Sequence, residues 1–121
     1  MKTWIIVGSL LAAIAVLLGA FGTHFLKNRI SPEDLSIFNT GIRYHMYHAL
    51  ALILIGILGF YYSSEIVLLP AILFTFGVFI FSGSLYFLVL TGFRWLGAIT
   101  PIGGLSFIVG WILLAFRIAK A

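Results

Sequence analysis

Residues 4–26 read WIIVGSLLAAIAVLLGAFGTHFL and contain no Asp, Glu, Lys or Arg. An α-helix needs about 20 mainly apolar residues to cross the ~30 Å hydrocarbon core of a bilayer, and this stretch is long enough. Backbone polar groups cannot stay unpaired in lipid, so a segment of this composition crosses as a helix. No clear A-x-A cleavage site follows, and we therefore expect a retained first helix rather than a signal peptide.

Three further apolar segments of spanning length follow at residues 42–62, 66–90 and 96–116. The chain has 121 residues, of which 63% are hydrophobic and 8% charged, and its mean hydropathy is +1.23. Soluble domains carry about 25% charged residues. We therefore predict an all-α integral membrane protein with one domain over residues 1–121. Short connections at 62–65 and 91–95 make neighbouring helices antiparallel, which predicts a four-helix bundle.

The connection at residues 27–41 is the only long one. Ser31-Pro32-Glu33-Asp34 is typical of a helix start, with Ser31 as the cap and Pro32 in the first turn. A helix from Pro32 to Tyr62 would measure about 46 Å at ~1.5 Å per residue, more than a ~30 Å core accommodates. We therefore expect a short interfacial helix at residues 32–39, separated from the second spanning helix by a bend near Gly41.

Charge and cysteine content exclude several classes of function. The 7 Lys and Arg residues exceed the 3 Asp and Glu residues, but they flank the apolar runs, where they anchor helices to headgroups. We expect membrane lipids as partners, with anionic headgroups recognised through Arg43 and Arg94, and no nucleic acid. The chain has no cysteine and therefore no disulfide or thiolate metal site.

Small residues recur at three- and four-residue steps on the first and fourth predicted helices. Such stripes let helix backbones approach closely in lipid. One short bundle does not obviously need so many, so we also expect self-association into a homo-oligomer. The stripes comprise Gly8, Ala12, Ala15, Gly19, Gly22, Gly103, Ser106 and Gly110.

Polar side chains within or beside the apolar segments fall at one end of the predicted bundle. Ionisable groups in spanning segments face protein or water, and they mark function by default. The same groups would also fix helix packing by hydrogen bonding between helices. The predicted polar pocket comprises His24, Arg43, Tyr44, Tyr47, His48, Ser82, Ser84, Tyr86, Arg94 and Thr100.

Several chemical interpretations of this pocket compete. His24, His45 and His48 could supply imidazole ligands to a metal, but a convincing ligand pattern is missing, and we expect neither metal nor cofactor. A proton conduit would need titratable groups along a whole path, whereas these occupy one half of the predicted bundle. A Ser84–His48–Asp34 triad lacks the G-x-S-x-G context. A half-depth pocket for a lipid headgroup or small molecule remains as the alternative to a structural role.

Four stretches carry a resemblance to a known family: residues 19–24 (GAFGTH), 47–52 (YHALAL), 81–86 (FSGSLY) and 90–104 (LTGFRWLGAITPIGG). With them the chain resembles the small membrane proteins catalogued as "domain of unknown function 423", whose eukaryotic relatives are called transmembrane protein 256-like. Thr23 and His45 depart from the pattern, since such proteins often have Ala and Gln there. A three-histidine site would therefore not be a family feature.

The resemblance implies a compact four-helix membrane protein and supplies no catalytic or ligand residues. We therefore predict a non-enzymatic, multi-pass protein of the bacterial inner or plasma membrane, structural or membrane-organising and self-associating. The alternative is a subunit of a carrier that binds a small molecule, a lipid headgroup or a metal.

Overall fold

A computed structural model describes residues 2–121; Met1, part of the predicted domain, lies outside them. The described residues form helices joined by short connections, without strands. Two five-residue segments, η1 and η2, are π-helical, and η3 is a 3₁₀ helix. The elements are α1 (Lys2–Leu17), η1 (Leu18–Gly22), α2 (Thr23–Leu26), α3 (Pro32–Leu58), α4 (Ser64–Gly77), η2 (Val78–Ser82), α5 (Gly83–Thr91), η3 (Arg94–Ala98) and α6 (Thr100–Lys120).

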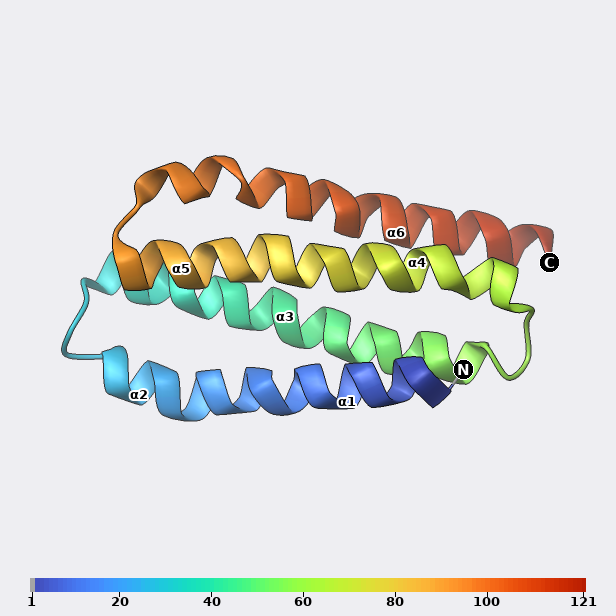
Figure 1. Cartoon of the computed structure of the whole chain (residues 1–121), viewed down its shortest axis with the longest axis horizontal. Helices are drawn as coiled ribbons and strands as arrows, with labels where there is room; N and C mark the ends of the chain where they lie inside the picture. The colour runs from blue at the N-terminus through green and yellow to red at the C-terminus, as the bar shows by residue number, and fades with distance from the viewer. Residues whose placement is uncertain (1) are drawn as a thin grey trace.

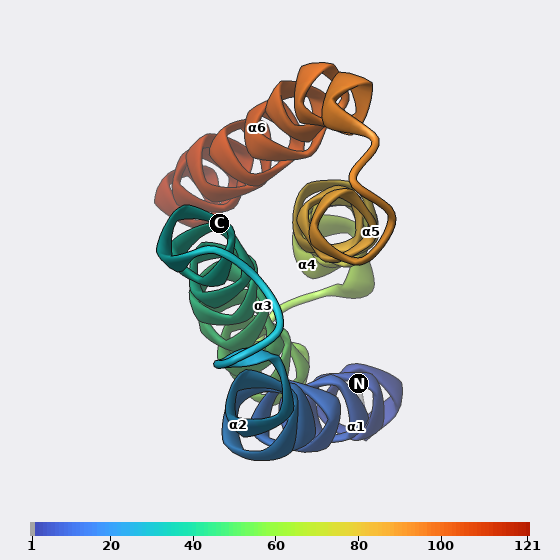
Figure 2. The same ribbon diagram turned by 90° about the vertical axis from the view of Figure 1, so that its left-hand side faces the viewer.

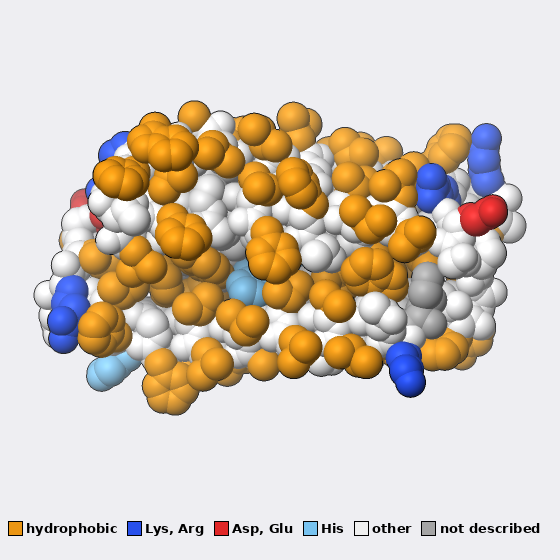
Figure 3. All heavy atoms as spheres, in the orientation of Figure 1, with side chains coloured by type: hydrophobic (Ala, Val, Ile, Leu, Met, Phe, Trp, Pro, Cys, Tyr) orange, Lys and Arg blue, Asp and Glu red, His pale blue; other side chains and the backbone are white. Residues whose placement is uncertain are grey.

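These elements join into four long helical rods, which run antiparallel in chain order (Figure 1). Each rod is long and apolar enough to cross a membrane: Lys2–Leu26, Pro32–Leu58, Ser64–Thr91 and Arg94–Lys120. Charged side chains gather at the two ends of the molecule, and hydrophobic side chains cover the surface between them (Figure 3). The predicted all-α membrane fold with four spanning helices is confirmed.

The predicted start of the second spanning helix is wrong. Ser31 caps α3 as expected, accepting the amide N–H of Asp34 at 3.1 Å. The helix then continues without interruption through Gly41, so residues 32–39 are its first two turns rather than a separate interfacial helix. Gly41 serves close packing instead of a bend, because a Cβ there would lie 2.9 Å from the Tyr86 ring.

Rod length explains why α3 needs no break. Its 27 residues measure about 40 Å at ~1.5 Å per residue. The other three rods have 25, 28 and 27 residues, so α3 is not unusually long in this protein. Tilting, or ends that project from the hydrocarbon core, accommodates such an excess at modest cost.

Seen along the rods, α3 and the α4–α5 rod form the centre of the molecule, with α1–α2 on one side and α6 on the other (Figure 2). The α1 helix packs on α3, and α6 packs on α4 and η2. The main core lies between the central rods and includes Leu52, Ile55, Val67 and Phe74, all fully or almost fully buried.

The stripes of small residues face inward. A Cβ on Gly8 would lie 2.6 Å from the carbonyl oxygen of Ala49 on α3. On α6, a Cβ on Gly103 would overlap the Phe81 backbone, and one on Gly110 would lie 2.7 Å from the Phe74 ring. Small residues thus bring α1 against α3, and α6 against the α4–η2 segment. These contacts account for the stripes within a single chain, and self-association stays a prediction.

Candidate functional site

The polar side chains predicted to form one pocket separate into small hydrogen-bonded sets, each joining a different pair of elements. The most buried set surrounds His48 on α3, whose side chain is 4% exposed. Trp111 of α6 donates its indole N–H to Nε2 of His48 at 3.0 Å. Nε2 therefore accepts, and Nδ1 carries the proton and donates it to the Tyr44 carbonyl oxygen at 2.7 Å. Both ring nitrogens are occupied within the protein.

Aromatic rings complete the surroundings of His48. Its imidazole stacks on Phe107 of α6 with ring centroids 3.5 Å apart and planes 8° from parallel. Phe74 of α4 meets the imidazole edge-on at 5.3 Å. The Tyr44 ring packs against Phe81, with centroids 4.7 Å apart. The arrangement is that of a satisfied core histidine rather than of an open acid–base or ligand site.

A second set joins α3 to η2 and α5. Ser82 is fully buried and donates its hydroxyl to the carbonyl oxygen of Gly41 at 2.6 Å. One turn further along α3, Nδ1 of His45 lies 2.8 Å from the Tyr86 hydroxyl. Nε2 of His45 is buried and has no hydrogen-bond partner within residues 2–121.

The remaining polar pairs lie towards one end of the rods. The hydroxyls of Ser84 and Thr100 are 2.6 Å apart and join α5 to α6. Arg94 at the start of η3 forms a two-pronged ion pair with Asp34 in the first turn of α3, with N–O distances of 2.8 and 2.9 Å. Arg43 donates to the Thr40 hydroxyl at 3.2 Å on its own helix. Both arginines expected to bind headgroups thus have partners within the chain.

The early start of α3 changes the depth of the two central histidines. His45 is the middle residue of α3, and His48 lies less than one turn beyond it. Phe107, which stacks on His48, is the middle residue of the Arg94–Lys120 rod. The sequence placed these histidines near one helix end; the structure places them at mid-length, where a charged imidazole would be most costly.

Other predicted members of the pocket stay apart. His24 is exposed near the end of its rod, and Tyr47 is 55% exposed; neither makes a side-chain hydrogen bond in the described part of the chain. Residues 2–121 contain no group of three His, Cys, Asp or Glu residues arranged to hold a metal, so His24, His45 and His48 do not converge. The triad of Ser84, His48 and Asp34 does not form either, since each is bonded elsewhere.

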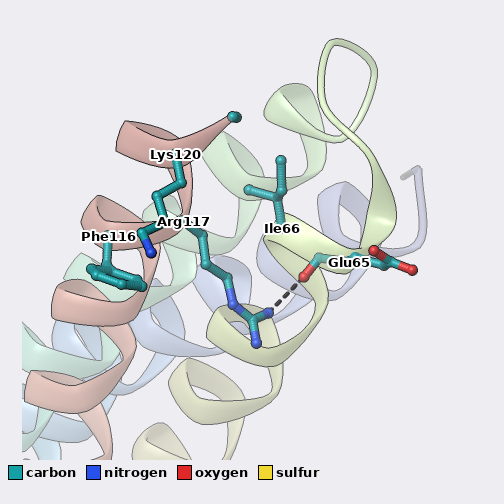
Figure 4. A pocket seen from close by; sticks show the side chains of 6 residues that line it. Glu65, Ile66, Phe116, Arg117 and Lys120 are labelled. Carbon is teal, nitrogen blue, oxygen red and sulfur yellow. Dashed lines mark hydrogen bonds between the residues drawn. The ribbon is translucent and has the colours of Figure 1, made fainter.

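Several hollows lie on the surface of the described residues, and three of them border the residues discussed above or the ends of the rods. One, of about 350 Å³, lies at the rod ends beside Glu65, where Arg117 donates to the Glu65 carbonyl oxygen at 2.6 Å (Figure 4). The Glu65 carboxylate points away from Arg117 in this view. A second, of about 310 Å³, lies beside His48 between α3 and α6. The third, of about 260 Å³, lies beside His45 between α1 and the α4–α5 rod.

Sequence reasoning missed three residues that shape these sites: Trp111, Asp34 as the partner of Arg94, and Gly83. A Trp well inside a spanning segment, away from the interfacial belts where Trp is enriched, is a signal that could have identified Trp111 as a hydrogen-bond donor. Nothing in the sequence pairs Asp34 with Arg94, which lie 60 residues apart.

The comparisons with known proteins agree with this architecture. The family model described as "Protein of unknown function (DUF423)" matches residues 18–104, a range that contains every residue of the predicted pocket. The chain belongs to this family. The resemblance noted from four short stretches is thus confirmed.

Relatives of this DUF423 protein match it along almost its full length. The UPF0382 membrane protein SSP2132 of Staphylococcus saprophyticus is 50% identical over 120 residues, which are 99% of each chain. The UPF0382 membrane protein YwdK of Bacillus subtilis is 44% identical over 122 residues, covering 99% of this chain and 98% of its own. No solved structure matches significantly. The relatives are named as membrane proteins, and their names specify no activity.

Proposed function

We propose that this protein is a non-enzymatic helical scaffold of the bacterial plasma membrane, in which the polar side chains hold the rods in register. The double engagement of His48 carries the proposal. An imidazole that acts as base, acid or metal ligand must present a free nitrogen, whereas His48 uses one for Trp111 and the other for Tyr44. The origin of the relatives in Staphylococcus and Bacillus supports the plasma membrane as its location.

The same reasoning extends to the other sets. Ser82 joins the central rods, Ser84 joins α5 to α6, and Arg94 ties η3 to the start of α3. Hydrogen bonds between helices in a membrane contribute on average about 0.6 kcal/mol each. Several such bonds link α3, the α4–α5 rod and the η3–α6 rod to one another. Together they can hold these helices in a fixed arrangement.

A rescue experiment tests the scaffold proposal. A deletion strain is screened for growth defects under membrane stress, and the Trp111→Phe and His48→Phe/Trp111→Phe variants are then tested for rescue. Variants that reach wild-type levels in the membrane should restore growth, because a scaffold needs the fold and not the imidazole. Folded variants at normal levels that fail to rescue would contradict the proposal and assign a direct role to His48.

The folding unit of this scaffold is the single chain. Both stripes of small residues pack inside it, and their close contacts leave no room for a second backbone on those faces. Native mass spectrometry from a mild detergent should show monomer across protein concentrations. If the protein is instead a dimer, and Gly8→Leu or Gly103→Leu abolishes that dimer in chains that remain folded, the monomer proposal is contradicted. The glycine stripes would then form the interface between two chains.

Contacts with anionic lipids belong to the free basic side chains rather than to Arg43 and Arg94. Lys27 and Arg29 are exposed in the connection between α2 and α3, and Arg29 lies over the Phe25 ring at 4.1 Å. Exposed basic residues near a membrane surface contribute about 1 kcal/mol each to attraction of anionic lipids. Lipid retention measured by native mass spectrometry should fall with Lys27→Gln/Arg29→Gln and should not change with Arg94→Gln.

A further inference from the structure

A groove between α1 and the α4–α5 rod has features that helix packing does not explain. Leu11, Ile14 and Leu18 form its α1 side. Val78, Phe79, Gly83 and Phe87 form the opposite side, and His45 of α3 lies between them together with Tyr86.

The first feature is the unpartnered nitrogen of His45. The side chain is 3% exposed, and Nε2 has no hydrogen-bond partner among residues 2–121. The backbone of Leu11 on α1 lies close to the imidazole, but it offers Nε2 no hydrogen bond of good distance and angle. Leaving a buried polar group unpaired costs about 1–3 kcal/mol. A partner from outside the chain would remove that cost.

The direction of the hydrogen bond between Tyr86 and His45 sets what this partner must be, and either atom can be the donor in it. The Ser82 hydroxyl donates to Gly41, and the hydrogen bond of Tyr86 runs to Nδ1 of His45. When Tyr86 donates to Nδ1, the single proton of the neutral imidazole lies on Nε2. The buried nitrogen is then a donor, and it needs an acceptor oxygen from its partner.

The second feature is Gly83, which also lines the groove. A Cβ built on Gly83 would meet nothing within 4 Å, whereas those on Gly8, Gly41, Gly77, Gly103 and Gly110 would meet neighbouring atoms at close range. Close helix packing therefore does not require glycine here, and its absent side chain leaves the groove open. The groove also borders both π-helical segments, through Leu18 of η1 and Phe79 of η2. Such segments occur frequently at functional sites.

The depth of His45 narrows the chemistry of the partner further. His45 is the middle residue of α3, so the groove lies well away from both rod ends, towards the centre of the hydrocarbon core. Phospholipid ester oxygens lie about 15 Å from that centre, at the edges of a ~30 Å core. A charged headgroup at mid-depth would cost several kcal/mol. The acceptor oxygen must therefore belong to a neutral molecule dissolved in the membrane interior.

We propose that this groove binds a neutral, chain-bearing lipid of the quinone class, whose ring carbonyl accepts a hydrogen bond from Nε2 of His45. The volume of about 260 Å³ lies just below the ~300 Å³ at which small-molecule pockets begin, so the ring enters and the chain lies outside along α1. The α1 helix packs chiefly on α3. Nε2 is enclosed, so the ring reaches it only when α1 side chains such as Leu11 move aside.

Nuclear magnetic resonance of ¹⁵N-histidine-labelled full-length protein in phosphatidylcholine nanodiscs tests this site. The chain has only three histidines, so a His45→Phe variant assigns the His45 signals. Before any addition, Nε2 of His45 should be protonated. Decylubiquinone should then shift this resonance in a saturable way, while decylbenzene, which has a chain and a ring but no carbonyl oxygen, should leave it unchanged.

Groove-filling variants locate the binding. Gly83→Leu enters open space and should abolish the decylubiquinone shift while leaving the melting temperature near that of the wild type. If Gly83→Leu does not fold, Ile14→Trp, which fills the groove from α1, replaces it. An unprotonated Nε2, an equal shift with decylbenzene, a shift that survives in the filled groove, or no shift at saturating decylubiquinone would each overturn the proposal.

Discussion

Trp111 donates its indole N–H to Nε2 of His48 across 3.0 Å, between two helices that are far apart in the sequence. Both residues lie within about one turn of the middle of their rods. Donor and acceptor are therefore paired where neither could bond to water. The His48 imidazole also stacks on Phe107 of α6, so a directional hydrogen bond and ring stacking both join α3 to α6.

We expect a measurable coupling energy between His48 and Trp111. The double-mutant cycle compares His48→Phe, Trp111→Phe and the double variant, all of which keep an aromatic ring in place. Such bonds in membrane proteins average about 0.6 and reach about 1.7 kcal/mol, so we predict a coupling of roughly 0.5–1.5 kcal/mol. Unfolding in mixed micelles with increasing dodecyl sulfate measures it.

His24 provides the control for that cycle. It is exposed near the end of its rod and makes no side-chain hydrogen bond with the described residues, so His24→Phe should leave stability unchanged and should show no coupling to Trp111→Phe. A coupling near zero between His48 and Trp111 would mean that the indole finds another acceptor in the membrane.

Adjacent glycines on α6 should respond in opposite ways to alanine. A Cβ on Gly103 would overlap the backbone of Phe81, which cannot rotate away, so Gly103→Ala should destabilise by about 1–3 kcal/mol. A Cβ on Gly104 would lie 3.7 Å from the Phe81 ring, an ordinary contact. Gly104→Ala should be neutral or stabilise by up to about 1 kcal/mol through helix propensity. Melting temperatures in one detergent compare the two, and equal effects would contradict the close approach of α6 to η2.

The sequence predicted the four rods because hydrophobic length and short loops leave few other arrangements. It misplaced the start of α3 because the length criterion assumes that a helix ends where the hydrocarbon core ends. Here the cap at Ser31 starts the helix early, and Phe38 packs it into a second core cluster with Leu26, Leu88 and Val89. Packing against neighbouring rods, which hydropathy does not record, keeps those first turns in the same helix.

The polar pocket was less predictable. Helical spacing gives the angle between His45 and His48, but not which rod lies beside each of them. In the structure one side chain meets Tyr86 and the other meets Trp111, from different rods. His45 has one ring nitrogen without a partner among the described residues, and both nitrogens of His48 have one. This difference depends on these neighbours. No pattern within a single helix could have distinguished them.

Two hydroxyls on the α4–η2 segment allow a hydrogen bond between helices to be compared with a hydrogen bond within one helix. Ser82 donates to Gly41 of the neighbouring rod, whereas Thr75 donates to the carbonyl of Ala71 on its own helix at 2.8 Å. Ser82→Ala should lower stability by about 0.5–1.5 kcal/mol, because it removes a buried link between rods. Thr75→Val should change it by less than about 0.5 kcal/mol. Denaturation curves that reverse this order would show that the Ser82 bond does not hold the rods together.

The ion pair between Arg94 and Asp34 should stabilise the end of the molecule only at low ionic strength. Its arginine is 60% exposed, and salt screens such charges within about 10 Å at 0.1 M. Asp34→Asn and Arg94→Gln should each lower the melting temperature slightly in low salt and not in high salt. The exchanged variant Asp34→Arg/Arg94→Asp should recover most of the loss, since the two side chains would still face each other. A loss that persists in high salt, or an exchanged variant less stable than either single change, would show that packing around Asp34, rather than charge, is what Arg94 supports.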